Sequence, residues 1–420
     1  MKQTNLQVTL LCLAALAVAS CSNENEPLSG PDNGNGNNEP VELGITAGVS
    51  LTKSAINGGE QTGAYADTTM KYVAVYAVGS KTGDTGGSSD YSDGNNYAIY
   101  TRGNNASTWS NEGESAPKIL LTGEKATIYA FHPAHKPGGK FEMKATEPLT
   151  VTSFTAESTI PITVFPGDDV TDADSATITV SPNNADKIYS SGWVDNATAG
   201  SILSAKGEVD YMWATSVQNV SNGKEATKAD DPSKVTLEMN HAMSMVSFRI
   251  YNDGTYKGAG KLSQIVLSNV SNGTALTKGT DPKMKVADGE VTPGSAVAVT
   301  YTRKIKDSSN NAYFTLKKVG SDDATTTDAQ AKEASPKFSI LVMPDASASA
   351  KNAIQAVFAI DGVDYAVPLA ADANSKVKWD KGKNNLYTVK LSGTGLEITS
   401  VKVQPWTTND VTSGGDLEAK

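Results

Sequence analysis

The sequence predicts an all-β protein, built as two tandem β-sandwiches behind an export signal and a tether. Three observations predict this fold. Apolar and polar residues alternate in many short segments, clusters of Gly, Asn, Asp and Pro separate these segments, and helical periodicity is hard to find after the first twenty residues. No single hairpin period runs through the chain, which favours sandwiches over one barrel.

Residues 1–20 are typical of a lipoprotein signal peptide. Lys2 precedes an apolar stretch from Leu10 to Ala19, which is too short to span a bilayer. Small residues then precede Cys21, as in a lipobox. The other cysteine, Cys12, would leave with the signal peptide, so we expect no disulfide. We predict that Cys21 carries palmitate-like acyl chains and anchors the precursor to the outer membrane.

The expected organisation of the mature chain follows from composition. Residues 21–40 are predicted to be a lipidated, disordered tether, because Leu28 is their only sizeable apolar residue. The polar run 222–233 contains almost nothing that could pack, so it is the expected seam. We therefore predict an N-terminal sandwich over 41–230 and a C-terminal sandwich over 234–420.

Alternating or apolar segments define the expected strands within these two units. They are 41–51, 72–78, 97–101, 126–131, 211–215, 235–239, 245–251, 265–267, 313–316, 338–343, 354–360, 386–391 and 396–403.

The segment 41–51 shows the clearest alternation, so one of its faces is expected to be buried. Its apolar residues are Val41, Leu43, Ile45, Ala47, Val49 and Leu51. The segment lies directly before Lys53-Ser54, which a Gly-rich loop-like stretch follows. The pattern fits a permanent edge strand as well as a strand that cleavage after Lys53 would remove.

Three groups of residues occur in an order that resembles a known family. The groups are Ile128 to Pro133, an aromatic strand ending in proline; Val235 to Phe248, a strand, a His-Ala-Met turn and a strand; and Trp379, Gly382, Tyr387 to Leu391, Gly393 to Leu396 and Pro405-Trp406, the closing strands. Together with the lipobox, this order resembles the fimbrillin family of Bacteroidetes, Mfa-like and FimA-like pilus subunits made from lipoprotein precursors.

The resemblance implies a pair of transthyretin-like sandwiches and the function of a structural subunit of a type V-like fimbria that supports cell adhesion. It implies that a surface protease removes the first strand, here between Lys53 and Ser54, and that a neighbouring subunit refills the groove by donor-strand exchange. Lys53 stands where the family commonly has arginine. Implied partners are other pilus subunits, the outer membrane through the lipid, and a host or bacterial surface ligand. The position as stalk, tip or accessory subunit stays open.

The candidate donor segment lies near the C-terminus and contains Leu396, Ile398, Val401 and Val403. The parity of this apolar series shifts between Ile398 and Val401, which indicates a β-bulge or a hand-over from an internal strand to a donated one. The tail after Trp406 has few sizeable apolar residues, so it is a poor donor by itself.

No motif predicts an enzyme, and no cofactor or metal is expected. His132 and His135 lack a neighbouring glutamate or cysteine, and His241 is interpreted as a hydrogen-bonding residue. An acidic cluster lacks the glycine and closing glutamate of an EF-hand loop, so a solvated loop is favoured; it comprises Asp168, Asp169, Asp172 and Asp174. The formal charge of −10 has no basic stripe, which argues against nucleic acid as a partner.

The main alternative is a surface glycan-binding lipoprotein of a polysaccharide-uptake system. Such a protein would keep its first strand and stay monomeric. Its sugar platform would come from aromatic residues near long loops of the first domain, although such residues more often lie in a core. They are Trp109, Trp193, Trp213, Tyr91, Tyr97 and Tyr100.

Overall fold

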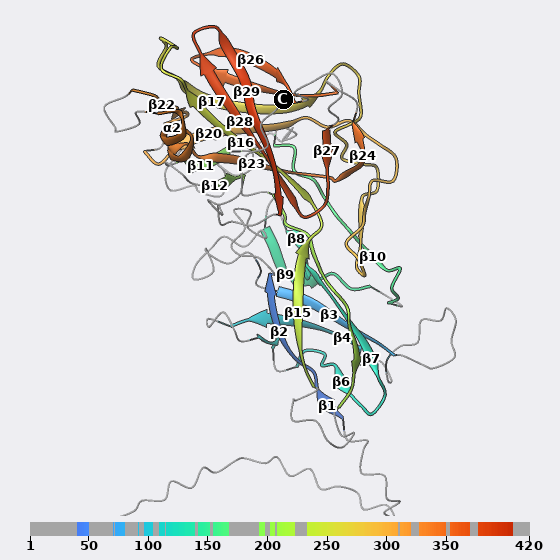
Figure 1. Ribbon diagram of the computed structural model, residues 1–420. Coiled ribbons are helices and arrows are strands. Elements are labelled where there is room, and N and C mark those ends of the chain that lie inside the picture. The colour runs from blue at the N-terminus through green and yellow to red at the C-terminus, as the bar shows by residue number, and fades with distance from the viewer. Residues whose placement is uncertain are drawn as a thin grey trace, which may run out of the picture. The chain divides into compact units, whose positions relative to one another are not determined.

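The computed structural model consists almost entirely of β-strands, which confirms the predicted all-β class (Figure 1). Each strand expected from the sequence overlaps an observed strand. No helix in the described part of the chain is long and apolar enough to cross a membrane. The structure describes residues 40–49, 70, 72–79, 91, 96–103, 109–113, 115–138, 142–151, 154–167, 193–197, 202–205, 208–222, 233–309, 311–320, 327–349, 353–369 and 377–405.

An eight-stranded sheet carries the beginning of the described chain (Figure 1). Across the sheet its strands are β2 (Gly44–Val49), β15 (Lys234–His241), β13 (Met212–Ala214), β7 (Ala126–His132), β3 (Tyr72–Gly79), β4 (Tyr97–Arg102) and β5 (Trp109–Asn111), and β14 (Val217–Val220) also pairs with β7.

Both faces of this sheet are buried, because β3 sends alternate side chains into two different cores. Val73, Val75 and Ala77 join Leu43 and Ile45 in a core of the N-terminal unit. The intervening residues of β3, together with Phe131 and Phe154, belong to a larger core that continues into the C-terminal half. The first core is therefore the one that β2 helps to close.

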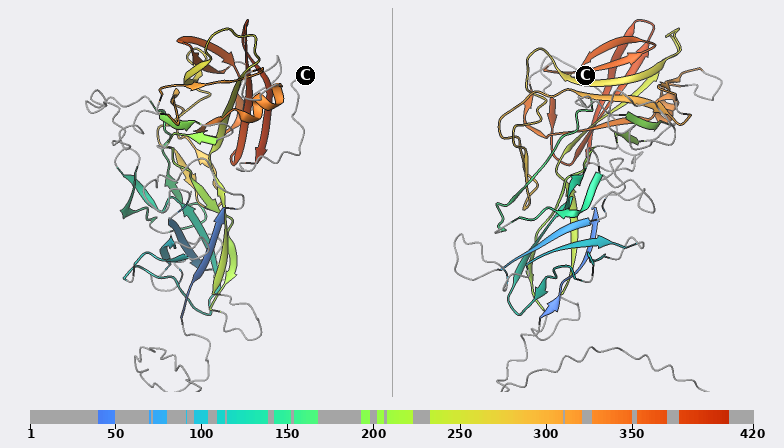
Figure 2. Two further views of the ribbon diagram at one scale, coloured as in Figure 1. Left: turned by 90° about the vertical axis from the view of Figure 1, so that its left-hand side faces the viewer. Right: turned by 180° about the vertical axis from the view of Figure 1, so that it is seen from behind.

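Two six-stranded sheets form the C-terminal sandwich (Figure 2). One contains β11 (Trp193–Ala197), β20 (Tyr301–Asp307), β17 (Lys261–Asn269), β25 (Ile354–Ile360) and β26 (Val363–Pro368), with β21 (Phe314–Thr315) on β17. The other contains β12 (Ile202–Ser204), β23 (Lys337–Val342), β16 (Ser244–Asn252), β28 (Lys383–Ser392) and β29 (Gly395–Pro405), with β22 (Lys317–Lys318) on β16.

Aromatic side chains join these two sheets. Phe248 of β16 meets Phe358 of β25 edge-to-face, with ring centroids 5.4 Å apart, and lies 5.7 Å from the ring of Tyr387 in β28. The indole Nε1 of buried Trp379 donates to the Tyr387 hydroxyl at 3.1 Å. These aromatic residues therefore lie at the centre of the C-terminal sandwich. The large apolar area that they bury stabilises the packing of its two sheets.

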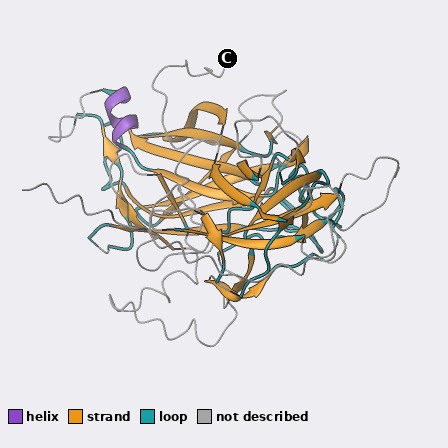
Figure 3. Ribbon diagram, turned by 90° about the horizontal axis from the view of Figure 1, so that it is seen from below, coloured by secondary structure: helices purple, strands orange, loops and turns teal. Residues whose placement is uncertain are grey.

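Smaller sheets and one short helix complete the described structure (Figure 3). The small sheets pair β1 (Val41–Glu42) with β6 (Leu120–Leu121), β8 (His135–Gly138) with β9 (Glu142–Pro148), β24 (Asp345–Ser349) with β27 (Val377–Trp379), and β10 (Thr159–Pro161) with β18 (Lys283–Lys285) and β19 (Val291–Thr292).

The helix, α2 (Asp328–Ala334), was not expected from the sequence. Thr327 caps its first turn, and Gln330 completes a capping box by accepting from the Thr327 N–H. This pattern of Thr followed three residues later by Gln is a helix-start signal visible in the sequence. The helix was overlooked because it is only seven residues long.

The predicted seam at 222–233 does not coincide with the division of strands between sheets. β15 begins after that seam and yet pairs with β2 and β13 of the eight-stranded sheet. β11 and β12 precede the seam and pair in parallel with β20 and β23 of the C-terminal sandwich. The chain therefore crosses between the two units more than once, and the expected boundaries 41–230 and 234–420 stay a prediction.

Candidate functional site

The predicted removable segment forms an edge strand of the eight-stranded sheet. β2 pairs in parallel with β15 from Gly44 opposite Lys234 to Val49 opposite Met239. The Gly44 N–H donates to the Ser233 carbonyl at 2.8 Å. In Figure 1 the blue ribbon of β2 runs beside the yellow-green ribbon of β15. Removal of the whole segment would therefore break the ladder with β15 and the short pairing of β1 with β6, and leave the rest of the eight-stranded sheet in order.

The apolar residues of this segment enter the N-terminal core to different depths. Leu43 is 1% exposed and Ile45 is 6% exposed, whereas Ala47 and Val41 are half-buried. On the opposite face, the Thr46 hydroxyl lies 3.0 Å from the Thr236 hydroxyl. The side chain of Val49 and the whole of Leu51 lie outside the described residues. Leu43 and Ile45 are thus the two side chains that fill the groove.

Side chains from β4 and β5 hold the outer edge of β2. The Tyr100 hydroxyl donates to the Leu43 carbonyl at 2.6 Å, and the Trp109 indole donates to the Ala47 carbonyl at 3.1 Å. The Leu43 N–H donates to the Ile119 carbonyl at 2.9 Å. Burial, followed by the nearby Glu42 carboxylate, raises the pKa of Tyr100, so its hydroxyl stays protonated. The bond from Leu43 to Ile119 continues the short β1–β6 pairing, and the side chains of Tyr100 and Trp109 close the edge beyond it.

An exposed polar contact fixes the residue before this strand. The Glu42 carboxylate accepts from Lys118 Nζ at 2.7 Å and from Asn111 Nδ2 at 2.5 Å. The side chains of Lys118 and Glu42 are 45% and 43% exposed, so solvent screens this pair. The contact fixes the position of the residue before β2, but it contributes little to the free energy of unfolding.

The candidate donor residues lie in β29, the edge strand next to β28. Leu396, Ile398 and Val401 pack against the large core, whereas Val403 is 50% exposed. Their register explains the parity shift seen in the sequence. Ile398 lies opposite Val389 and Ser400 lies opposite Thr388, so Thr399 is an extra residue in a bulge. The bulge lets all four apolar residues point to one face.

The predicted lipidation and cleavage residues lie outside the described part of the chain. These are Cys21, Lys53 and Ser54. The acidic cluster between Asp168 and Asp174 also lies outside it. Their roles stay predictions.

The three histidines are structural partners within the described sheets. His132 Nδ1 lies 2.8 Å from the Tyr72 carbonyl, and complete burial lowers the pKa of His132. His135 Nε2 lies 3.2 Å from a Glu112 carboxylate oxygen. His241 Nδ1 lies 2.9 and 3.0 Å from the two carboxylate oxygens of buried Asp210. No group of three His, Cys, Asp or Glu able to hold a metal ion occurs among the described residues.

The aromatic residues considered for a sugar platform are dispersed. Tyr91 is fully buried, and Tyr97 donates its hydroxyl proton to the Leu149 carbonyl at 3.2 Å. Trp213 packs against the backbone of Gly289, where an added Cβ would lie 2.0 Å from the ring, and Lys381 Nζ lies 5.2 Å from its centroid. Tyr100 and Trp109 donate hydrogen bonds to the carbonyls of Leu43 and Ala47. The described aromatic side chains therefore do not form one shared surface for a sugar. The side chain of Trp193 lies outside the described residues.

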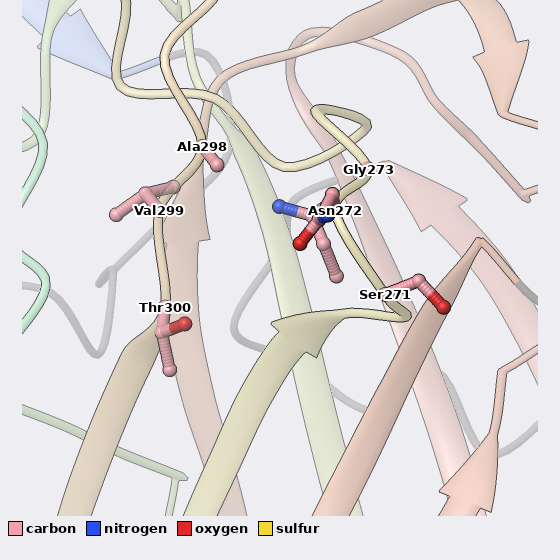
Figure 4. A pocket seen from close by; sticks show the side chains of 7 residues that line it. Ser271, Asn272, Gly273, Ala298, Val299 and Thr300 are labelled. Carbon is pink, nitrogen blue, oxygen red and sulfur yellow. The ribbon is translucent and has the colours of Figure 1, made fainter.

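A pocket of about 300 Å³ opens between the turn after β17 and the segment before β20 (Figure 4). Asn272 and Ser271 border one side, and Val299 and Thr300 border the other. No aromatic or charged residue is among its described lining residues. The pocket offers neither a stacking surface nor a charge for a sugar or ion.

A buried ion pair was missed by the sequence reasoning. Arg303 of β20 donates to Glu208 Oε1 at 2.5 Å and to the carbonyls of Phe165 and Pro166 at 2.9 Å. Glu208 Oε1 also accepts from the Leu341 N–H at 2.8 Å. Burial raises the pKa of Glu208, and the Arg303 charge opposes that rise. The pair joins four segments that lie far apart in the sequence, which gives it a structural role.

These features define a β-sandwich protein in which an edge strand near the beginning of the described chain covers the core of an eight-stranded sheet. The model of the Fimbrillin-like family matches residues 162–406, more than half of the chain. The protein therefore belongs to the fimbrillin-like family. Membership supports a pilus structural subunit at the cell surface.

The chain is similar to several solved structures at low sequence identity. A putative cell adhesion protein from Bacteroides ovatus is 14% identical, with a TM-score of 0.50, over 89% of this chain and 99% of that one. One from Bacteroides uniformis is 16% identical, with a TM-score of 0.48, over 88% and 98%. The tip fimbrial protein Mfa3 from Porphyromonas gingivalis is 10% identical, with a TM-score of 0.40, over 86% and 99%. None of the curated proteins gives a significant match.

Proposed function

We propose that this protein is a structural subunit of a cell-surface fimbria that supports adhesion, and that it polymerises by donor-strand exchange after its first strand is removed. The observation that carries the proposal is the edge position of β2 with Leu43 and Ile45 buried beneath it. An edge strand is the one element of a sheet that can leave without dividing the sheet.

The buried side chains supply the driving force for refilling the groove. Burial contributes about 1.5–3 kcal/mol for each of Leu43 and Ile45, so an empty groove forfeits about 3–6 kcal/mol as an upper estimate. The ladder with β15 is lost as well. A strand from another subunit restores both contributions by β-augmentation.

The C-terminal end supplies a segment of matching chemistry. Leu43-Gly-Ile45-Thr-Ala47, which leads into β2, and Leu396-Glu-Ile398-Thr-Ser400 in β29 share the order Leu, any residue, Ile, Thr and a small residue. Both leucines and both isoleucines face a core. The β29 segment, once released from β28, would therefore present to an open groove nearly the side chains that β2 presents.

Export as a lipoprotein is the proposed first step of maturation. The acyl chains on Cys21 would hold the precursor at the outer membrane until cleavage after Lys53 frees Ser54 as the new N-terminus. The N-terminal residue of protein recovered from intact cells tests this order. Lipidated Cys21 identifies the precursor, and Ser54 identifies the polymerising form. An N-terminus inside β2 would contradict the proposed cleavage site.

The assembly test uses the purified full-length precursor, a trypsin-like protease and electron microscopy. We expect loss of residues 21–53 followed by filaments. A Lys53→Ala variant is the matched control, and it should stay intact at this position and monomeric. Filaments from uncleaved Lys53→Ala protein, or clean loss of residues 21–53 without any polymer, would refute the proposal.

A further inference from the structure

We propose that a row of three side chains on the exposed face of β15 selects the strand that refills the groove, and that the strand it fits is β29 of a second copy of this chain. The row consists of Lys234, Thr236 and Glu238, and we call it the β15 row. The inference deepens the proposed function and rests on it, because the row would select a strand only after β2 has left. It identifies the incoming strand by its charges.

The first strand presents no charge to the β15 row. Each residue of the row has a partner in β2 in the parallel register: Lys234 pairs with Gly44, Thr236 with Thr46, and Glu238 with Gly48. The two threonine hydroxyls lie 3.0 Å apart. All three side chains of the row are exposed, so they can meet the side chains of the strand beside them. Because glycine has no side chain, β2 offers the two charges of the row nothing to pair with.

The last strand carries the complementary charges at the matching positions. Its four apolar residues can take positions 43, 45, 47 and 49 if the bulge at Thr399 is kept, because a strand without a bulge would turn the last two of them outward. These residues are Leu396, Ile398, Val401 and Val403. The residues between them then face the β15 row: Glu397 lies opposite Lys234, Ser400 opposite Thr236, and Lys402 opposite Glu238.

The incoming strand therefore forms two pairs of opposite charge and one pair of hydroxyl groups with the row. An added Cβ at Gly44 would lie 2.9 Å from Lys234 Cγ, so the lysine side chain has to rotate when Glu397 takes this position. The lysine is exposed and its ammonium group has three donors, so it can turn toward the incoming carboxylate. Opposite charges on neighbouring strands attract, and like charges repel.

The partners of β29 in its own sheet follow nearly the same order. They are Lys390 opposite Glu397, Thr388 opposite Ser400, and Leu386 opposite Lys402. The first of these pairs is an ion pair. Strand β28 thus offers Lys, Thr and Leu where β15 offers Lys, Thr and Glu. Transfer of β29 to the groove of another subunit gives Lys402 an oppositely charged neighbour, Glu238, at the position where its own sheet has Leu386.

The β15 row acts on the choice between strands, and the buried side chains supply most of the affinity. Exposed ion pairs contribute little by themselves, because solvent screens them. A strand with the wrong charges, however, meets repulsion where the matching strand meets attraction, and selection depends on the sum of both effects. The row therefore favours β29 over other segments that alternate in the same way.

The test uses the full-length chain with Cys21→Ser, cleaved after Lys53 so that its first strand can exchange, and labelled peptides of residues 395–405. One peptide has the natural sequence, and the swapped peptide carries Glu397→Lys with Lys402→Glu. Both have the same composition and net charge, so their nonspecific attraction to the protein is equal. The groove is used in its natural form and in a swapped form, Lys234→Glu with Glu238→Lys.

We expect the natural groove to bind the natural peptide about 10-fold more tightly than the swapped peptide. Each of the two pairs changes from attraction to repulsion and contributes about 3-fold. The swapped groove should prefer the swapped peptide by a similar factor. Both preferences should fall below about 2-fold in about 1 M salt, because salt screens exposed charges.

The pair of Lys402 with Glu238 is tested alone, because β28 has no charge at this position. A peptide with only Lys402→Glu should bind the natural groove about 3-fold more weakly, and Glu238→Lys in the groove should restore its affinity. The matched control exchanges an exposed pair at β27, Lys378 and Asp380, whose charged atoms lie 3.2 Å apart. Lys378→Asp with Asp380→Lys should leave every preference unchanged.

A peptide of residues 41–51 shows whether the groove is open. If it binds and the natural and swapped peptides bind equally well, or if the preference does not reverse in the swapped groove, the selective role of the β15 row is overturned. If it binds and neither β29 peptide does, a strand other than β29 fills the groove, which overturns the inference and leaves the removable strand in place. Failure of all three peptides to exchange would instead contradict the removable strand, and with it the proposed function.

Discussion

The edge strands β2 and β29 lie near opposite ends of the described chain, and they are held in different ways. β2 pairs in parallel with β15, about 190 residues further along the sequence, and single side-chain hydrogen bonds close its outer edge. β29 follows β28 through a tight hairpin and pairs with it from Ser392–Gly395 to Lys383–Pro405. One cut therefore separates β2 from its sheet, whereas β29 stays attached to its partner by the turn.

Because of this difference, the two edge strands have different roles in the proposed assembly. The first strand can leave as a unit, because its removal disturbs only its ladder with β15 and the two-residue pairing of β1 with β6. The last strand cannot reach a neighbour's groove without first leaving β28, where Leu396, Ile398 and Val401 already pack. Donation by β29 would exchange one set of partners for a similar set. The transfer of β29 from β28 to another subunit therefore changes the free energy of the donor strand little. The favourable free energy of assembly comes from filling the empty groove of the receiving subunit.

The largest expected contrast comes from deleting one residue in each edge strand. Deleting Thr46 shifts the register within β2 and turns Leu43 and Ile45 away from the core, which costs about 3–6 kcal/mol in the free energy of unfolding. Deleting Thr399 removes the bulge residue and leaves strict alternation, with Ile398 still facing the core, so we expect a change within about 1 kcal/mol.

Urea denaturation of the uncut precursor measures both deletions. A Thr399 deletion as damaging as the Thr46 deletion would show that the bulge has a structural role of its own. The hydroxyl of Thr399, which donates to the Thr388 carbonyl at 3.3 Å, is the contact that the deletion loses.

Substitutions of single apolar residues give the next largest contrast. Leu43→Ala removes a side chain that is 1% exposed and leaves a cavity in the N-terminal core, which lowers the free energy of unfolding by about 2–4 kcal/mol. Val403→Ala removes a side chain that is 50% exposed, so its effect should stay within about 0.5 kcal/mol. Denaturant midpoints at constant m-value provide the measurement. Comparable losses in the two variants would contradict the depth of burial assigned to β2.

Some differences between β2 and β29 could be predicted from the alternation of apolar and polar residues in the sequence, and others could not. The alternation in 41–51 identified the buried side chains Leu43 and Ile45, and the parity shift at Ile398 identified the bulge as one of two alternatives. Period-two patterns report which face of a strand is buried, so both features were accessible without a structure.

Other features depend on pairing between distant segments, which periodicity does not report. Nothing local shows that Tyr100 and Trp109 meet the carbonyls of β2, or that β15 joins the N-terminal sheet. β20 escaped recognition because its sequence contains Arg303 and Lys306, charged residues that are nevertheless buried. Arg303 is tolerated there because Glu208, almost one hundred residues earlier, neutralises it.

Mild acid should distinguish the sheets that hold the two edges. All three histidines of the chain lie in or beside the eight-stranded sheet, and burial lowers the pKa of His132 in β7 below its ordinary value of 6.5. The unfolded chain therefore binds a proton at a pH where the folded chain does not. Above pH 6.5 the burial of this neutral histidine does not lower the free energy of unfolding. As the pH falls below 6.5, the unfolded chain gains a proton and the free energy of unfolding decreases.

We therefore expect the free energy of unfolding to decrease as the pH falls from 7 to 5.5. His132→Asn can keep a donor toward the Tyr72 carbonyl, and it should flatten the dependence of the denaturant midpoint on pH between 5.5 and 7. An unchanged slope in this variant would assign the pH dependence to other groups.

The smallest expected effects come from the exposed ion pairs, and each edge has one. Lys118 binds Glu42 ahead of β2, and Lys390 binds Glu397 between β28 and β29. Lys118→Gln and Lys390→Gln should each change the free energy of unfolding by no more than about 0.5 kcal/mol, because solvent and salt screen charges at this exposure. Denaturation at low and at high salt separates the charge from the packing of the side chain. A larger loss for Lys118→Gln that persists in high salt would mean that the lysine stem, and not its charge, holds the start of β2 in place. Such a result would add a difference between the two edge strands. The start of β2 would depend on the packing of the Lys118 side chain, whereas the hairpin already holds the start of β29 beside β28.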